Sequence, residues 1–300
     1  MTSTKPLLAV PNVSEGRERT IVQATARAFT KQGRARLLDV HSDADHHRSV
    51  FTLAGFQGDL SQAVLAGTRT AIERIDVGEG RDPADIGAHP HVGAVDVIPV
   101  VYLDAGQRGA ACAEALVVAH EVGNRLGVPV FLYGELAGGR TRAHLRRGGG
   151  KALAARIGAG ELQPDFGPPR LHPTAGATLV AAREPLVAFN LELAAPAKVE
   201  DARRIASLIR EGGAEGLQGV RAIGVALGGS GSVAQVSMNV ERPLEVPLRA
   251  VVEAVRRHAE IARGEIVGLA PRAALEGFPE NVELAGFDPG VHTIEKALGF

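Results

Sequence analysis

The chain has 300 residues, of which 45% are hydrophobic and 22% charged, and its formal net charge at pH 7 is -1. This balance is typical of a folded globular protein and excludes a mostly disordered or fibrous chain. The near-zero net charge gives no support for a nucleic-acid or anionic membrane partner, and the single cysteine, Cys112, excludes an intramolecular disulfide.

The start of the chain has no apolar signal core, and no run of about 18 uncharged apolar residues occurs anywhere in it. We therefore expect a cytoplasmic protein with no membrane anchor.

Hydrophobic periodicity predicts the elements of the first half. Asp59 and Gln62 form the pattern of a capping box at the start of a predicted helix. The order of elements is βαββαβ, followed by a further helix and strand. The expected strands are 7–13, 35–41, 48–54, 95–103 and 128–133, and the clearest helices are 59–75 and 109–126.

The second half repeats this order. Its expected elements are strand 186–193, helix 198–211, strands 220–227 and 233–240, helix 247–263 and strand 265–269. Two βαββαβ units in one chain predict an α+β fold of two ferredoxin-like subdomains, with helices on one face of each sheet. We place the boundary after an irregular proline-rich stretch near residue 178, which gives subdomains 1–178 and 179–300.

Three irregular segments are candidates for the functional site, because binding and catalytic residues are often carried by loops. They are the hairpin connection 39–49, the long link 77–94 and the proline-rich loop 162–177. The hairpin connection has two explanations. Its aspartates and serines are typical of a polar turn, and His41, His46 and His47 among these aspartates could instead form a metal site.

The link contains "HPH", in which Pro90 favours an extended conformation at His89. Imidazole has an ordinary pKa near neutrality, so it can accept a proton in one step and return it in the next. The alternative is a pair of surface histidines, His89 and His91, with no role.

Two other patterns bear on ligand binding. The glycine-rich pieces "GELAGGRTR" and "GGSGS" match no P-loop or dinucleotide fingerprint, so nucleotide phosphate is not expected. The arginine-rich run 140–156 is typical of a solvated helix face, and its functional alternative is a patch for an anionic ligand tail.

Together these segments resemble the formiminotransferase domain family, in family order from near the start to about residue 271. The stretches that carry the resemblance are "VPNVSEG" (10–16), "LLDVHSDADHHRSVFTLAG" (37–55), "HPHVGAVDVIPV" (89–100), "VPVFLYGE" (128–135), "PDFGPP" (164–169), "GATLVAAR" (176–183), "LVAFNLEL" (186–193), "QVSMN" (235–239) and "IVGLAP" (266–271).

The resemblance implies transfer of a formimino group from N-formimino-L-glutamate to tetrahydrofolate, in a homodimer that uses tetrahydrofolate as co-substrate and no metal. The catalytic histidine of the family falls on His89, an acidic residue on Asp39 and an arginine on Arg183. The folate-contacting loop falls on Gly167, Pro168, Pro169, Arg170, Leu171, His172, Pro173, Thr174, Ala175 and Gly176.

The chemistry suits these residue types. His89 would act as base and then acid, Asp39 would orient it, and Arg48 or Arg183 would pair with substrate carboxylates. The chain departs from the family at His47, where asparagine is common. Two alternatives stay open: a metal-dependent hydrolase of formiminoglutamate-like amidines, and a catalytically silent folate-binding module.

Overall fold

The computed structural model describes residues 5–31, 34–78, 91–228 and 233–300. These residues form two compact units, Met1–Arg183 and Glu184–Phe300, each of which is described by itself. No helix in the described part of the chain is long and apolar enough to cross a membrane.

The elements of the first unit are β1 (Leu7–Ala9), β2 (Asn12–Val13), α1 (Arg19–Lys31), β3 (Arg36–Asp43), β4 (Arg48–Gly55), α2 (Asp59–Ile72), β5 (Val95–Val101), η2 (Ala105–Gln107), α3 (Arg108–Arg125), β6 (Val130–Leu132), η3 (Gly134–Ala137), α4 (Arg142–Arg146), α5 (Gly149–Gly158) and β7 (Thr178–Arg183). Those of the second unit are β8 (Val187–Leu193), α6 (Val199–Ile209), β9 (Val220–Leu227), β10 (Val233–Val240), α7 (Leu248–Arg256), β11 (Ile261–Val267), η4 (Arg272–Leu275) and α8 (Ile294–Leu298).

The first unit is built on a seven-stranded sheet. Strand β4 pairs antiparallel with β3 on one side and with β1 and β2 on the other, and β5 pairs antiparallel with β1 and β2. These strands, with α1 and α2, make the predicted βαββαβ unit. Strands β7 and β6 then extend the sheet in parallel beyond β5. The sequence boundary expected near residue 178 falls on the first residue of β7, a strand that this pairing holds in the first unit.

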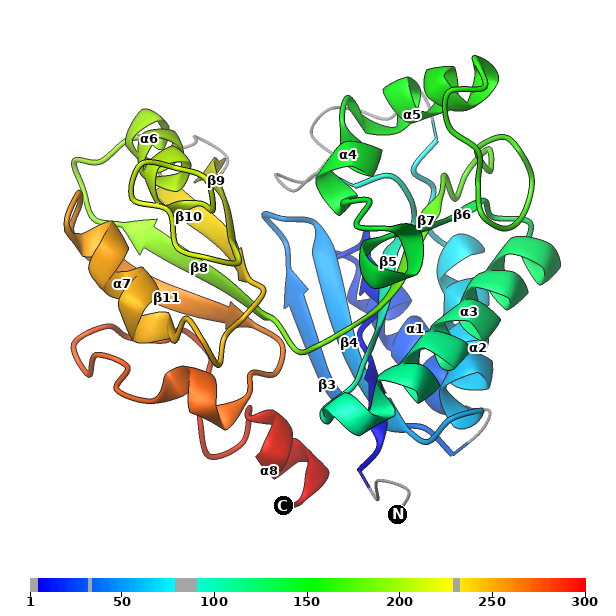
Figure 1. Cartoon of the computed structure of the whole chain (residues 1–300), viewed down its shortest axis with the longest axis horizontal. Helices are drawn as coiled ribbons and strands as arrows, with labels where there is room; N and C mark the ends of the chain where they lie inside the picture. The colour runs from blue at the N-terminus through cyan, green and yellow to red at the C-terminus, as the bar shows by residue number, and fades with distance from the viewer. Residues whose placement is uncertain (1–4, 32–33, 79–90, 229–232) are drawn as a thin grey trace. The chain divides into compact units, whose positions relative to one another are not determined.

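Helices cover both faces of this sheet (Figure 1). Because successive strand residues face opposite sides, Ile98 and Val180 pack in the core beneath α1, α2 and α3. Val97 and Leu179 instead pack with Leu145 of α4 and with residues of α5. The expected single helical layer thus corresponds to α1–α3, and α4 and α5 are an addition on the second face.

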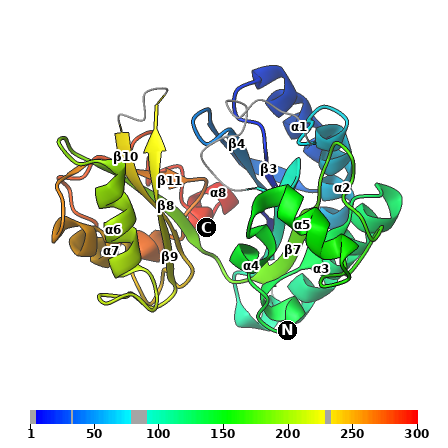
Figure 2. The ribbon, with the colours of Figure 1, turned by 90° about the horizontal axis from the view of Figure 1, so that it is seen from above.

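The second unit is a four-stranded antiparallel sheet in the order β11-β8-β10-β9. Helices α6 and α7 pack on one face of it, and their apolar residues share its core (Figure 2). The α+β fold of two βαββαβ units is therefore confirmed. The expected helix 247–263 is too long, because α7 ends at Arg256 and Ile261–Val267 pairs with β8 as β11.

The start of α2 shows a cap that the sequence does not reveal. No side chain of the N-cap residue Gly58 can cap the helix, and the expected capping box of Asp59 and Gln62 is wrong. Instead the buried carboxylate of Glu114, on α3, accepts hydrogen bonds from the backbone N–H groups of Gly58 (2.7 Å) and Ser61 (2.6 Å). A residue 53 positions away in the sequence therefore takes the capping role.

We expect Glu114→Ala to lower the free energy of unfolding by about 3 kcal/mol, because two N–H groups lose a charged acceptor, one of them in a buried contact. Urea unfolding would measure this change. The matched control is Gln62→Ala, an exposed residue of the rejected capping box, whose effect should stay within about 0.5 kcal/mol. Equal effects of the two variants would contradict the assignment of the cap to Glu114.

Candidate active site

The proline-rich loop is bound to the described residues on both sides of segment 79–90. Before that segment, the N–H of Val77 donates to the carbonyl of Thr174 (2.7 Å). After it, the N–H of Ala94 donates to Ala175 (3.0 Å), and the N–H of Ala177 donates to Val92 (2.9 Å). His89 and Pro90 lie outside the described residues, which resume at His91. Two of the three candidate segments therefore meet at the start of β5.

Two glycines allow this close approach. Gly93 and Gly176 form an antiparallel bridge, and the φ of Gly176 is +67°. A Cβ atom on Gly93 would overlap the carbonyl oxygen of Ala177 and lie 2.8 Å from that of Ala175. Both glycines are therefore required by backbone contact, which gives a tertiary reason for the two glycine-containing stretches "HVGA" and "TAGA".

Within the loop, His172 holds the turn. Its Nδ1 accepts hydrogen bonds from the N–H groups of Thr174 (3.3 Å) and Ala175 (3.0 Å), and residues 172 and 176 exchange backbone hydrogen bonds. The side of the loop before this turn is open to solvent at Pro169 and Arg170. The loop 167–176 thus has an anchored turn after His172 and two exposed residues, Pro169 and Arg170, before it.

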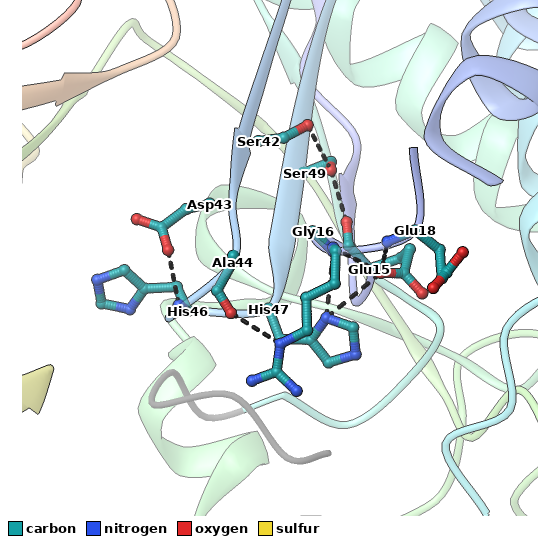
Figure 3. Close-up of polar contacts among 10 residues, drawn as sticks. Glu15, Gly16, Glu18, Ser42, Asp43, Ala44, His46, His47 and Ser49 are labelled. Atoms are coloured by element: carbon teal, nitrogen blue, oxygen red, sulfur yellow. Dashed lines mark hydrogen bonds and ion pairs between the residues drawn. The ribbon is translucent and has the colours of Figure 1, made fainter. Parts of the chain in front are cut away.

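The turn of the β3–β4 hairpin contacts residues 15 and 16 (Figure 3). The N–H of Gly16 donates to Nδ1 of His47 (3.2 Å), and a Cβ atom on Gly16 would overlap the carbonyl oxygen of Asp43. The carboxylate of Glu15 lies 3.4 Å from the same Nδ1 and accepts the N–H groups of Arg17 (2.8 Å) and Glu18 (2.9 Å). Glu15 therefore links the hairpin to the segment that leads into α1.

Two serines extend this connection to β5. The hydroxyl of Ser14 donates to the carbonyl of Gly93 (2.7 Å), and that of Ser49 donates to the carbonyl of Glu15. Ser42 lies 2.8 Å from Ser49. Sequence reasoning missed Ser14 and Glu15 as individual residues, although they belong to the quoted stretch "VPNVSEG", whose signal is its close match to the family pattern.

The hairpin histidines differ in their environments. His47 has a φ of +47°, in the left-handed region where asparagine and histidine are both enriched, so its backbone conformation suits either residue. Figure 3 shows the rings of His46 and His47 on opposite sides of the turn. Among the described residues, no group of three or more His, Cys, Asp or Glu side chains could hold a metal ion. The described part of this hairpin is a hydrogen-bonded polar turn.

A charged cluster lies beside the hairpin. Asp96, on β5, is fully buried, and its Oδ2 accepts hydrogen bonds from Arg48 (2.8 Å) and from Arg146 of α4. Its Oδ1 accepts the N–H of Val92 (2.9 Å). The same Val92 peptide binds the proline-rich loop through its carbonyl, so the cluster is joined to the loop by one residue.

Burial and charge act in opposition at these groups. Burial lowers the pKa of Arg48 to about 10, with further lowering by Arg146 and Arg142, against the raising effect of Asp96. Burial alone would raise the pKa of Asp96, but Arg146 and Arg48, with smaller contributions from His91 and the Val92 N–H, hold it below its ordinary value. The carboxylate and the guanidinium of Arg48 are therefore both charged at neutral pH.

The structure separates two of the predicted site residues from this cluster. Arg183 ends β7 opposite Val101, five residues beyond Asp96 on β5, which is about 17 Å along the strand. Asp39 pairs with Thr52 in the middle of β3. It lies about 13 Å along that strand from Asp43, the residue that pairs with Arg48 of the cluster. Arg48 and the loop lie together, whereas Arg183 lies at the other end of the sheet.

Comparison with known proteins gives consistent matches over nearly the whole chain. The profile described as "Formiminotransferase domain, N-terminal subdomain" matches residues 7–183, and "Formiminotransferase domain" matches residues 188–278. The chain is 34% identical to a glutamate formimidoyltransferase of Streptococcus pyogenes serotype M1, over 96% of this chain and 97% of that protein. It is 35% identical to one of Thermoplasma acidophilum, over 94% and 93%.

The match to a formimidoyltransferase-cyclodeaminase of Gallus gallus is 36% identical over 89% of this chain. It covers 50% of that relative, so the chain spans about half the length of the Gallus gallus protein. The two profiles match the two compact units in order, and the relatives of S. pyogenes and T. acidophilum are matched over nearly their whole length. This chain therefore belongs to the formiminotransferase family.

Proposed function

We propose that this chain transfers the formimino group from N-formimino-L-glutamate to tetrahydrofolate and releases 5-formiminotetrahydrofolate and L-glutamate. The observation that carries the proposal is the meeting of three segments at the start of β5. There the proline-rich loop 162–177 is bound on both sides of the segment that contains His89, and Val92 joins the loop to Arg48 through Asp96. The names of the relatives support the same reaction.

The reaction needs one proton to be removed and one to be supplied. N5 of tetrahydrofolate attacks the formimino carbon and loses its proton, and a tetrahedral adduct forms. When the adduct collapses, the bond from that carbon to the glutamate nitrogen breaks and the nitrogen gains a proton. His89 is proposed as the base in the first step and the acid in the second, with Asp39 favouring the charged imidazole.

Binding is assigned to the loop and to arginine. The loop from Gly167 to Gly176 is proposed to contact the folate, since Pro169 and Arg170 are exposed and the end of the loop is fixed to the start of β5. Arg48 is preferred over Arg183 as the partner of a substrate carboxylate, because Arg48 belongs to the network that contains the loop. Holding both substrates in register would supply much of the rate.

The pH dependence follows from one imidazole that cycles between two protonation states. We expect kcat/KM to fall at acid pH and to level off above the pKa of the imidazole, because His89 must start unprotonated and the proton that it takes in the first step is the one that it returns in the second. Initial rates measured between about pH 5.5 and 9 would show this profile. A flat profile would contradict the single-imidazole mechanism.

The proposed reaction is tested by a spectroscopic assay for the formimino adduct of tetrahydrofolate, with formiminoglutamate and tetrahydrofolate omitted in turn. Product should need both. A hydrolase would consume formiminoglutamate without tetrahydrofolate, and metal analysis of the purified protein would then identify its ion. A silent module would bind tetrahydrofolate and form no product. The homodimer and the cytoplasmic location are further parts of the proposal, and sedimentation would test the first.

A further inference from the structure

The cluster around Asp96 holds more positive than negative charge. Arg48 and Arg146 share one carboxylate, and Arg142 is close enough to affect the pKa of Arg48. The side chains of Arg48 and Arg146 are only 15% and 11% exposed. Like charges held together away from water are costly unless an anion balances them.

Two buried donors, one on Tyr133 and one on Arg146, lack a hydrogen-bond acceptor in the part of the chain that the structure describes. The guanidinium of Arg142 lies over the ring of Tyr133, 5.8 Å from its centroid. Tyr133 belongs to the apolar cluster that also contains Val97 of β5 and Leu145 of α4. Among the described residues, neither the buried hydroxyl of Tyr133 nor the buried Nε of Arg146 has a hydrogen-bond partner. Buried polar atoms are normally paired, so these two donors point to a missing acceptor.

We propose that Arg48, Arg142, Arg146 and Tyr133 form a subsite for a carboxylate of a glutamyl group, and that Asp96 is the residue that positions its guanidiniums. A guanidinium fork matches a carboxylate in two parallel hydrogen bonds. Asp96 anchors an arginine from the hairpin and one from α4, and so brings together donors from two separate elements. The inference deepens the proposed function and rests on it, since both proposed substrates carry glutamyl carboxylates.

The first test is Arg146→Met, which removes the guanidinium and keeps an unbranched apolar side chain in place of the arginine stem. We expect KM for one glutamyl-bearing substrate to rise about 10- to 100-fold, as for the loss of a hydrogen bond to a charged group, with kcat changed only a few-fold. The matched control is Arg147→Met, the next residue along, which is exposed. It removes the same charge and should leave both KM values unchanged.

The two sources of the carboxylate give different results. If the donor binds here, KM for formiminoglutamate rises and product inhibition by L-glutamate weakens by the same factor. If the glutamyl end of the folate binds here, KM for tetrahydrofolate rises in the variant. With tetrahydropteroate as substrate, which lacks the glutamyl group, the variant and the wild type should then have the same KM. Either result supports the subsite.

The proposal is overturned if Arg146→Met leaves both KM values unchanged, whatever happens to kcat or to thermal stability. Should that variant fail to fold, Arg146→Lys decides, because it keeps a positive charge beside Asp96 and loses the fork. An unchanged KM in a folded Arg146→Lys also overturns the proposal. Asp96→Asn should raise the same KM as Arg146→Met, and the double variant should be no worse than the single ones, because the two residues act as one unit.

A failure of the proposed function can be told apart from a failure of the subsite. The wild-type assay with both substrates tests the function without any variant. Calorimetric titration with L-glutamate tests the subsite without turnover, and binding that weakens in Arg146→Met but not in Arg147→Met supports it. L-glutamate binding that is equal in all three proteins would remove the donor as occupant, and the tetrahydropteroate comparison then decides.

Discussion

Replacement of His89 by alanine is expected to lower the rate of formimino transfer by about two to four orders of magnitude, the usual contribution of a positioned acid-base group. Tetrahydrofolate binding should survive, because the proposed folate contacts belong to the loop that ends at Gly176. Steady-state rates and a binding titration on the same preparation would measure the two effects. His89→Asn should behave like the alanine variant, since an amide has no titration near neutral pH.

The matched control for this experiment is His120→Ala, in which an exposed histidine of α3 is removed from the same unit. Its rate should stay within about twofold of the wild type, as expected for a surface substitution. A transfer rate that is unchanged in His89→Ala would remove His89 from the mechanism. Loss of tetrahydrofolate binding together with the rate would instead assign His89 a part in holding the folate.

Gly93→Ala is expected to lower both the stability and the activity of the protein. The added methyl group would overlap the carbonyl oxygen of Ala177, and backbone cannot move aside as a flexible side chain can. Forcing a methyl group into a filled space commonly costs up to about 3 kcal/mol. Because the same contact fastens the loop to β5, transfer activity should fall together with the midpoint of urea unfolding.

Gly109→Ala provides the control for that variant. Gly109 is exposed in the first turn of α3, and a Cβ atom there meets nothing within 4 Å. Alanine in a helix is favoured over glycine by roughly 0.5–1 kcal/mol, so this variant should be as stable as the wild type or slightly more so. If Gly93→Ala proves as stable and as active as Gly109→Ala, the close approach of the two glycine-containing segments is not needed by the native structure.

The fold was largely predictable because its information is local. The predicted strands 220–227 and 233–240 coincide with β9 and β10. They were predictable because alternation of apolar residues over eight positions indicates a strand with one buried face. Element ends were less predictable. The expected helix 247–263 included Ile261 and the two residues after it, and only pairing with β8 makes them the start of β11. The second helical layer over Val97 and Leu179 also depends on tertiary packing.

The candidate site divides in the same way. The sequence by itself determined the loop, the hairpin and the family pattern, because these are contiguous stretches with characteristic residue types. Only the tertiary structure decided that Glu114 caps α2 and that Asp96 pairs with Arg146, partners 50 or more residues apart. A carboxylate and a guanidinium can be read from a sequence, but their pairing cannot, because it depends on which strand and which helix the fold brings together in a space from which water is excluded.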